Sequence, residues 1–373
     1  KLEEAIATFN KALSLKPDYA EAYNNIGNVL QDQGDLEEAI EAFKKALSLK
    51  PSYAEAYNNK GNVLKHQGRL KEAIAAFKKA LSLKPNHAEF YNNMGVTLQE
   101  QGELDKSIEA YNNALSILPD HAGAHRNLSS LIKYEADNIQ IDTVKALMQR
   151  NDLKNEDVCH LHYTMAKMQE DLGDLQTAFR NYVSGGALRK KLLSYDLAND
   201  QLVFDRIKNT APKLKALSFN IPKRAKANVP IFILGMARSG TTLVEQIISC
   251  HSKVQAAGEL SFLKRFGGKL SIGDLPLNSE NLFKLRNSYL GELAQLSDNT
   301  LFVTDKMPNN FLHIGLILKA LPEAKIIHVT RDPAATCWSN FKHYFSGKGL
   351  GYSYNLNDTV NYFKMYQELM NFW

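Results

Sequence analysis

The sequence lacks the cysteine pairs of a secreted disulfide scaffold: its 373 residues include three cysteines. Cys159, Cys250 and Cys337 lie far apart and without the spacing of metal ligands, which argues against a structural zinc site. We expect buried, unpaired thiols in a reducing compartment, and therefore a cytoplasmic protein. The sequence also lacks an apolar run long enough to cross a bilayer and an initial signal-peptide pattern, so we expect no membrane segment.

A strong excess of charge of one sign is missing as well. The chain has 45 Lys and Arg residues against 40 Asp and Glu residues, and the net charge of +5 is spread along it. This balance gives no indication of a nucleic-acid partner. With 44% hydrophobic and 23% charged residues the composition is that of a folded globular protein, and the length predicts at least two domains.

The first half of the chain repeats itself. The segment that begins at Ala20 returns at Ala54 and Ala88, which gives a period of 34 residues. Small residues recur at the positions where two antiparallel helices must touch: Gly27, Gly61, Gly95, Ala46, Ala80 and Ala114. A proline closes each unit, because proline lacks the N–H group that would continue a helix: Pro51, Pro85 and Pro119. This spacing resembles tetratricopeptide repeats, which implies an all-α solenoid with a concave face.

The repeats extend beyond the three regular units. A half repeat occupies Lys1–Pro17 and a weaker unit begins at Ala122. A degenerate unit is recognisable from the turn at Leu172–Asp174 and from second-helix residues Ala178, Tyr182 and Gly185. We therefore expect three parts in the chain: a solenoid over 1–191, a helical linker over 192–228 that ends in a polar, basic stretch, and a further domain over 229–373.

An asparagine occupies the same position in four successive units: Asn25, Asn59, Asn93 and Asn127. We expect these side chains to form a ladder along the inner face of the solenoid. One interpretation is that their amides bind the backbone of an extended protein or peptide partner. The other, which we favour, is that asparagine at this position packs neighbouring helices together.

The third part begins with an apolar run, Val229–Leu234, suited to a buried parallel strand. The turn Gly235–Thr242 follows, and helical spacing begins at Leu243, so backbone amides and a helix N-terminus are available to hold a phosphate. Thr241 stands where the phosphate loop of ATP-hydrolysing enzymes requires lysine, and Arg238 lies inside the loop instead. A nucleoside kinase or triphosphatase is therefore disfavoured, also because no convincing magnesium carboxylate is present.

Basic residues follow two further predicted strands. Leu301–Thr304 is followed by Lys306, and Lys325–Thr330 is followed by Arg331, with Ser339 eight residues further on. Open α/β sheets bind ligands at the carboxyl ends of their strands. Two phosphate sites at separate strand ends fit a nucleotide with phosphates at its 3′ and 5′ positions better than a linear triphosphate.

Together these motifs resemble the sulfotransferase superfamily, and most closely its branch with arginine in the 5′ loop, which includes tyrosylprotein sulfotransferases. Repeats followed by such a domain look like bacterial tetratricopeptide sulfotransferases. The resemblance implies an α/β, P-loop-like domain with a central parallel sheet that binds 3′-phosphoadenosine 5′-phosphosulfate (PAPS). It assigns the 5′-phosphosulfate to Arg238, Ser239, Gly240, Thr241 and Thr242, and the 3′-phosphate to Arg331 and Ser339.

The resemblance also implies a catalytic set. Glu259 matches the general base of that branch and Lys306 matches its catalytic lysine, with Arg238 as the third member. The expected reaction is transfer of a sulfuryl group from PAPS to a hydroxyl acceptor, with Glu259 taking the hydroxyl proton. We expect no metal, because a sulfuryl group bears less charge than a phosphoryl group.

Departures from the family pattern limit what carries over. Leu260–Phe262 replaces further polar and basic residues, so tyrosine specificity is not transferred, and the acceptor can be a peptide tyrosine, a sugar or a small alcohol. His343 replaces an arginine near the 3′ site. Because the chain begins inside a repeat and family sequences continue past Trp373, we expect both ends to be truncated. A different class, an inactive nucleotide-binding scaffold, stays open, although Glu259 and Lys306 argue against it.

Overall fold

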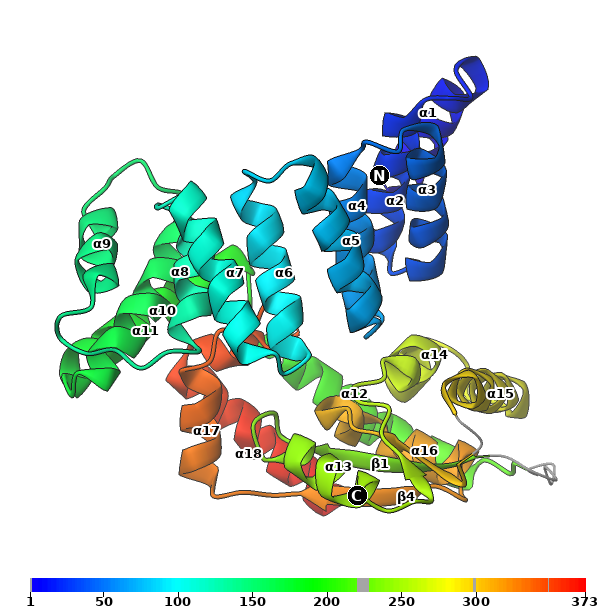
Figure 1. Ribbon diagram of the computed structural model, residues 1–373. Coiled ribbons are helices and arrows are strands. Elements are labelled where there is room, and N and C mark those ends of the chain that lie inside the picture. Colours follow the sequence, from blue (N-terminus) through cyan, green and yellow to red (C-terminus); the bar gives the residue numbers. More distant parts are fainter. Residues whose placement is uncertain (1, 220–227, 298–299, 348) are drawn as a thin grey trace. The chain divides into compact units, whose positions relative to one another are not determined.

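The computed structural model describes residues 2–219, 228–297, 300–347 and 349–373 (Figure 1). It divides into two compact units, Lys1–Gly185 and Gly186–Trp373, which are described separately. The division falls inside one helix. It precedes the end of the solenoid expected at residue 191.

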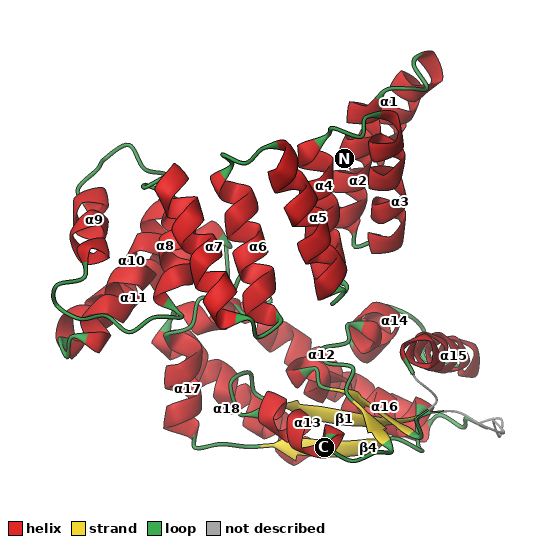
Figure 2. Ribbon diagram, in the orientation of Figure 1, coloured by secondary structure: helices red, strands yellow, loops and turns green. Residues whose placement is uncertain are grey.

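The first unit consists of helices in its described residues, whereas strands appear in the second (Figure 2). Its helices are α1 (Leu2–Leu15), α2 (Ala20–Gln33), α3 (Leu36–Leu49), α4 (Ala54–His66), α5 (Leu70–Leu83), α6 (Ala88–Glu100), α7 (Leu104–Ile117), α8 (Ala122–Ser129), α9 (Ile139–Met148), α10 (Asn155–Asp171) and the first part of α11 (Leu175–Leu192). The helices α2 to α7 form three hairpins, so the predicted all-α solenoid is confirmed.

The small residues of the repeat allow each pair of helices to pack closely. A Cβ atom added to Gly27 would lie 2.6 Å from the Phe43 ring, and the same clash recurs between Gly61 and Phe77 and between Gly95 and Tyr111. The alanines of the second helices are fully buried as well: Ala46, Ala80 and Ala114. Close packing of interiors explains why bulky residues are excluded here.

The degenerate unit forms a helical hairpin as well. Gly173 makes the turn between α10 and α11 with a φ of +84°, a conformation that glycine adopts without strain. Ala178 and Tyr182 are buried, and a Cβ on Gly185 would lie 2.9 Å from the Tyr163 ring. The packing of the regular repeats is therefore preserved despite the weak sequence signal.

The asparagines of successive repeats are joined to one another. Asn59 donates to Asn24 (3.1 Å), and the same bond recurs from Asn93 to Asn58 (3.1 Å) and from Asn127 to Asn92 (2.8 Å). Each bond links one repeat to the preceding one. The structure thus supports the packing interpretation of this position and shows that the acceptors are the asparagines one residue earlier in the motif.

The second unit contains a small sheet and its covering helices. The strands are β1 (Val229–Gly235), β2 (Val254–Gln255), β3 (Phe302–Asp305) and β4 (Lys325–Val329). The helices are α12 (Leu197–Ala216), α13 (Thr241–Ser249), α14 (Phe262–Ser271), α15 (Ser279–Leu296), α16 (Ile314–Ala320), α17 (Pro333–Phe341) and α18 (Leu356–Phe372), with 3₁₀ turns η1 (Pro308–His313) and η2 (Gly351–Tyr354). The three predicted strands are present, and β2 is an addition.

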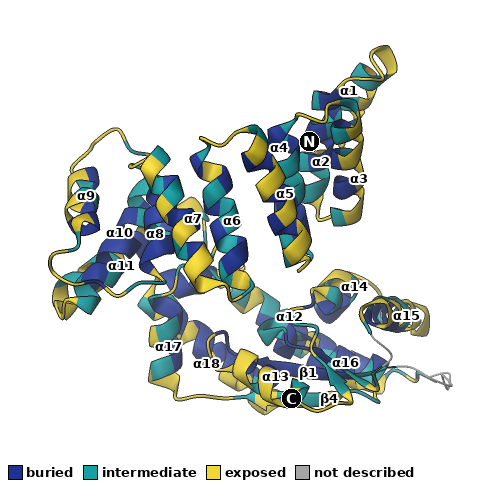
Figure 3. Ribbon diagram, in the orientation of Figure 1, coloured by how far each residue is buried: buried dark blue, intermediate teal, exposed yellow. Residues whose placement is uncertain are grey.

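All strand pairs are parallel, in the order β2-β3-β1-β4. Strand β1 lies at the centre and is buried along nearly its whole length, as Figure 3 shows. Phe232 and Leu234 belong to the large apolar core of the unit. The central parallel sheet predicted from the apolar runs is confirmed, because a strand buried on both faces needs continuous apolar sequence.

The helix expected to act as a linker belongs to the second unit. Phe204, Ile207 and Leu214 of α12 are buried in the same core as β1. The segment 192–228 is thus not a separate connection over its helical part, since three apolar side chains of α12 leave water there. Most of the polar, basic stretch lies outside the described residues.

The cysteines and the helices bear on two further expectations. Cys159 and Cys337 are buried, but Cys250 is exposed at the end of α13, contrary to the expectation of buried thiols. In the parts of the chain that the structure describes, no helix is both long and apolar enough to cross a membrane.

Candidate active site

The candidate site lies at one edge of the sheet. Because the four strands are parallel, their carboxyl ends meet at the same edge. The loop 236–240 follows β1, Glu259 follows β2, Lys306 follows β3 directly, and Arg331 follows β4. The fold therefore places all the segments expected to bind the donor or to act on it at a common edge.

The loop between β1 and α13 is held tightly at its start. A Cβ on Gly235 would lie 2.4 Å from the Val329 carbonyl oxygen, so only glycine fits where β1 leaves the sheet beside β4. Arg238 has a φ of +65°, which is strained for a residue with a side chain. The loop so formed leads directly to the N-terminus of α13, where anions are favoured.

The side-chain hydroxyl of Ser239 in this loop makes no hydrogen bond with the described residues. Its side chain is 6% exposed, and its Oγ atom finds no hydrogen-bond partner in the described structure. A buried hydroxyl without a partner is costly, and such groups point to a missing ligand. Ser239 also lines a cavity of about 480 Å³ together with Arg331.

Two candidate residues from different motifs touch each other. Arg238 donates through Nε to Ser339 Oγ at 3.2 Å, which joins the β1–α13 loop to α17. Asn340, the next residue of α17, is buried and donates to the Ala237 carbonyl at 2.8 Å. The expected 5′ and 3′ sites are thus adjacent. Sequence reasoning did not identify Asn340.

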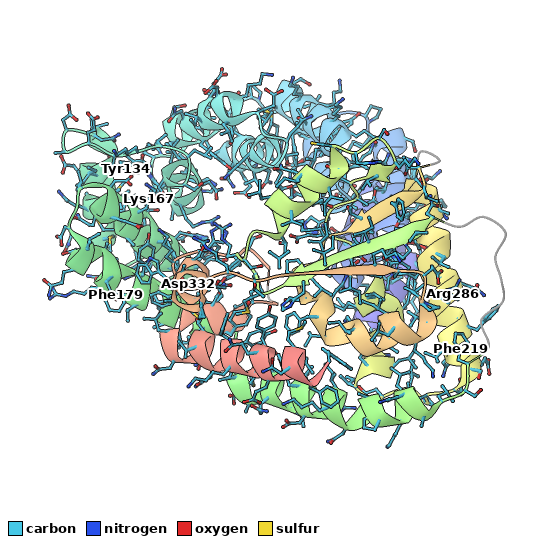
Figure 4. The ribbon with its side chains drawn as sticks, turned by 90° about the horizontal axis from the view of Figure 1, so that it is seen from below. Tyr134, Lys167, Phe179, Phe219, Arg286 and Asp332 are labelled. Carbon is cyan, nitrogen blue, oxygen red and sulfur yellow. The ribbon has the colours of Figure 1, made fainter. Side chains whose placement is uncertain are left out.

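Arg331 is exposed and makes no hydrogen bond or ion pair with any described residue. The next residue, Asp332, labelled in Figure 4, accepts from the Ala335 N–H at 2.7 Å and so caps α17. Because this cap fixes the start of α17, Arg331 stands between the end of β4 and the helix that carries Ser339.

The expected base and the expected catalytic lysine form an ion pair. Lys306 Nζ donates to Glu259 Oε1 at 2.7 Å. The Lys306 side chain is 9% exposed and that of Glu259 is 55% exposed, so the carboxylate faces solvent while the ammonium lies inside the edge. An exposed carboxylate therefore lies beside a buried positive charge at this edge of the sheet.

Behind this pair lies Asp305, whose side chain is fully buried at the end of β3. Burial raises the pKa of this carboxyl from 3.8 to about 7, although hydrogen bonds from Tyr289 and Asn310 act in the opposite direction. The neutral acid is thus favoured in the folded state up to near neutral pH. Sequence reasoning missed Asp305, because a carboxylate at a strand end carries no local signal of burial.

The histidines near these segments contact Ser, Tyr and Phe side chains. His313 is buried and its Nδ1 lies 2.7 Å from Ser271 Oγ, and burial lowers its pKa to about 4. His328 interacts with the Tyr366 hydroxyl, and the His343 ring packs against Phe345 at 4.5 Å between centroids. Across the described residues, no group of three or more His, Cys, Asp or Glu side chains gathers as metal ligands.

Family models match both units. Residues 230–373 match the model described as the sulfotransferase family. Residues 18–86 and 52–120 match a tetratricopeptide-repeat model, and residues 1–34 match a second model of the same repeat.

A relative from another organism matches part of the chain. An "uncharacterized protein" of Aquifex aeolicus (strain VF5) is 28% identical over 261 residues, and the match covers 64% of this chain and 34% of that protein. The chain thus spans about a third of the length of this relative.

Solved structures resemble the chain over about half its length. YrrB, a repeat protein described as having an unusual peptide-binding site, is 20% identical over 48% of this chain and 91% of its own, with a TM-score of 0.37. PilW, a type IV pilus biogenesis factor, is 25% identical to this chain. The match covers 48% of this chain and 83% of PilW, with a TM-score of 0.40.

Proposed function

The chain carries a domain of the sulfotransferase family after an array of tetratricopeptide repeats, and from this premise we propose that it transfers a sulfuryl group from PAPS to a hydroxyl acceptor. The observation that carries the proposal is the ion pair between Glu259 and Lys306 at the sheet edge that also holds the Arg238 loop. A solvent-facing proton acceptor beside a buried cation suits transfer to a hydroxyl group.

The residues of the loop fit the donor. The Ser239 hydroxyl lacks a partner, and the backbone N–H groups at the start of α13 suit the 5′-phosphosulfate together with Gly240, Thr241 and Thr242. Arg331 has no partner among the described residues and is therefore available to a 3′-phosphate. Ser339, the second residue expected at this phosphate, accepts a hydrogen bond from Arg238 of the loop. Guanidinium groups suit this task, because they bind phosphate oxygens through two parallel hydrogen bonds.

In the proposed reaction each residue has one task. Glu259 takes the proton of the acceptor hydroxyl as its oxygen attacks sulfur, so the S–O bond to the acceptor forms while the bond to the leaving phosphate breaks. Arg238 and Lys306 stabilise the charge that develops on that phosphate. Lys306 must loosen its bond to Glu259 for both residues to act.

We further propose that the repeats recruit a protein or peptide, because stacked helical repeats form extended binding surfaces. The asparagine amides at positions 59, 93 and 127 already bond to neighbouring repeats, so the binding surface must use other side chains as well. The bound protein can carry the hydroxyl acceptor or hold the enzyme near it.

A titration tests the donor. We expect 3′-phosphoadenosine 5′-phosphate to bind at least about tenfold more tightly than ATP, since charge-assisted contacts to the second phosphate are worth roughly 1.5–3 kcal/mol. ATP as the tighter ligand would contradict the proposal and favour a kinase or triphosphatase. Tight binding of the bisphosphate without transfer to any hydroxyl compound would favour the alternative of an inactive nucleotide-binding scaffold.

A further inference from the structure

Glu245 is a buried carboxylate to which the proposed reaction gives no task. It lies in the second turn of α13 and is 6% exposed. This helix follows the loop 236–240, which we call the donor loop because the proposed function assigns the donor to it. Its Oε1 atom accepts from the Gly258 N–H at 3.0 Å and from the Thr304 hydroxyl at 2.6 Å. A buried carboxylate is tolerated only where hydrogen bonds replace its water, so these two donors fix its position.

The same hydrogen bonds continue into the segment before Glu259. Thr304 Oγ1 accepts from the Ala257 N–H at 3.1 Å, and the Gly258 carbonyl accepts from the Lys306 N–H at 2.8 Å. Gly258 is thus held through its N–H by Glu245 and through its carbonyl by Lys306. Three elements, namely α13, the segment after β2 and the end of β3, are tied together at one residue.

This arrangement matters because few contacts of the Glu259 side chain fix its position. Its side chain is 55% exposed, and Lys306 is the one described residue with which it shares a side-chain hydrogen bond. Its place therefore depends on the backbone on either side of it, namely on Gly258, which has a φ of +69°, and on Leu260, whose side chain is buried in the core. Misplacement of a catalytic group by about 1 Å can cost about 100-fold in rate.

We propose that Glu245 is a positioning residue: it ties the base Glu259 and the lysine Lys306 to the helix that starts at the donor loop, and so sets the distance between donor and base. The inference rests on the proposed function, since it takes Glu259 as the base. Glu245 acts through Gly258 and Thr304 and touches neither donor nor acceptor. Supporting residues of this kind keep a catalytic set in its productive geometry.

Two substitutions of similar size separate this role from a packing role. Glu245→Gln keeps an acceptor oxygen for Gly258 and Thr304, whereas Glu245→Leu removes it. We expect Glu245→Leu to lower kcat by about 10- to 100-fold while KM for PAPS changes less than about threefold. Glu245→Gln should retain most of the wild-type kcat. Asp200→Asn, which alters a half-buried carboxyl bonded to Tyr195 in the same unit, should leave kcat unchanged.

Three results would overturn the proposal: wild-type kcat in Glu245→Leu, equal losses in Glu245→Leu and Glu245→Gln, or a fall in kcat matched by an equal fall in affinity for 3′-phosphoadenosine 5′-phosphate. The last would show damage to the donor loop. If Glu245→Leu does not fold, Thr304→Val serves in its place, because it removes the acceptor of the Ala257 N–H. We then expect a loss in kcat of about three- to tenfold, and an unchanged kcat would contradict the proposal.

Hydrogen exchange gives a readout without turnover. We expect the Gly258 amide to exchange slowly in the wild-type protein and in Glu245→Gln, and at least about tenfold faster in Glu245→Leu. Unchanged exchange in the leucine variant would refute the positioning role. If the wild-type protein neither binds 3′-phosphoadenosine 5′-phosphate nor transfers sulfate, the proposed function fails, while the exchange measurement still decides whether Glu245 holds Gly258.

Discussion

The two units of this chain are built on different principles. In the repeat array the same contact recurs, since Gly27 meets Phe43 as Gly61 meets Phe77 and Gly95 meets Tyr111. In the second unit each contact at the site occurs once, as in the pair of Glu259 and Lys306. A repeated contact can be predicted from the period of the sequence, whereas a contact that occurs once can be recognised only in the folded structure.

The sharpest way to test a single contact is to remove the proposed proton acceptor. Glu259→Gln keeps the size of the side chain, so turnover should fall by about 10²–10⁴-fold while affinity for 3′-phosphoadenosine 5′-phosphate stays within a few-fold. Steady-state kinetics and a binding titration measure the two quantities. Near wild-type turnover would remove Glu259 as the base.

The second test concerns Arg331, which has no partner among the described side chains. Arg331→Ala should weaken 3′-phosphoadenosine 5′-phosphate more than about tenfold, a cost of roughly 1.5–3 kcal/mol, and should leave adenosine 5′-phosphate unaffected. Calorimetric titrations of both nucleotides make the comparison. Equal losses for both would mean that Arg331 does not serve the 3′-phosphate.

Asp305 predicts a pH dependence confined to the second unit. Its pKa is about 7 in the folded state against 3.8 ordinarily, so between these values the folded state holds a proton that the unfolded state has lost. The free energy of unfolding should therefore fall as pH rises from about 4 to about 7, and the decline should be weaker in Asp305→Asn. Chemical denaturation at several pH values tests this. Equal slopes in the two proteins would contradict the assigned pKa.

Matched glycine substitutions compare the two units directly. Gly61→Ala and Gly235→Ala each place a Cβ less than 3 Å from a neighbour, the first against the Phe77 ring and the second against the Val329 carbonyl oxygen. Each should destabilise its own unit by about 1–3 kcal/mol. Only Gly235→Ala should weaken donor binding, because only this glycine starts the loop that we propose to bind the donor. Loss of nucleotide binding in Gly61→Ala would break the comparison.

The smallest expected effect lies in the asparagine ladder. Asn59→Ala removes the hydrogen bond to Asn24 and a longer one, 3.4 Å, that Asn59 accepts from Asn58, and should lower the stability of the array by about 1 kcal/mol. Asn25 makes no hydrogen bond with the described residues, so Asn25→Ala is the matched control. Thermal unfolding measures both. A larger loss for Asn25→Ala would show that this position does not act through links between repeats.

Sequence alone predicted the elements that carry strong patterns. The period revealed the helices of the array, and the apolar runs revealed β1, β3 and β4 nearly to the residue. Strand β2 was missed, because two residues, Val254 and Gln255, leave no pattern. Helix α12 was taken for a linker, since its buried side chains can be recognised only against the core they enter.

The candidate site was predicted from the sequence as a set of residues, and only the structure shows how these residues are arranged. The pairing of Lys306 with Glu259 joins positions 47 residues apart, and no spacing rule connects them. Glu245 was overlooked because a glutamate within a helix resembles a surface residue until its burial is known. The contact of Arg238 with Ser339 likewise depends on the parallel order of β1 and β4.

Transfer itself is the most direct test of the central claim. The wild-type protein is incubated with PAPS labelled in its sulfur, and in parallel with ATP labelled in its γ-phosphate, together with fractionated cell extract, and labelled products are separated. We predict sulfur-labelled acceptor that forms with the wild-type protein and is lost in Glu259→Gln, with no phosphate-labelled acceptor. Phosphate transfer without sulfur transfer would contradict the account.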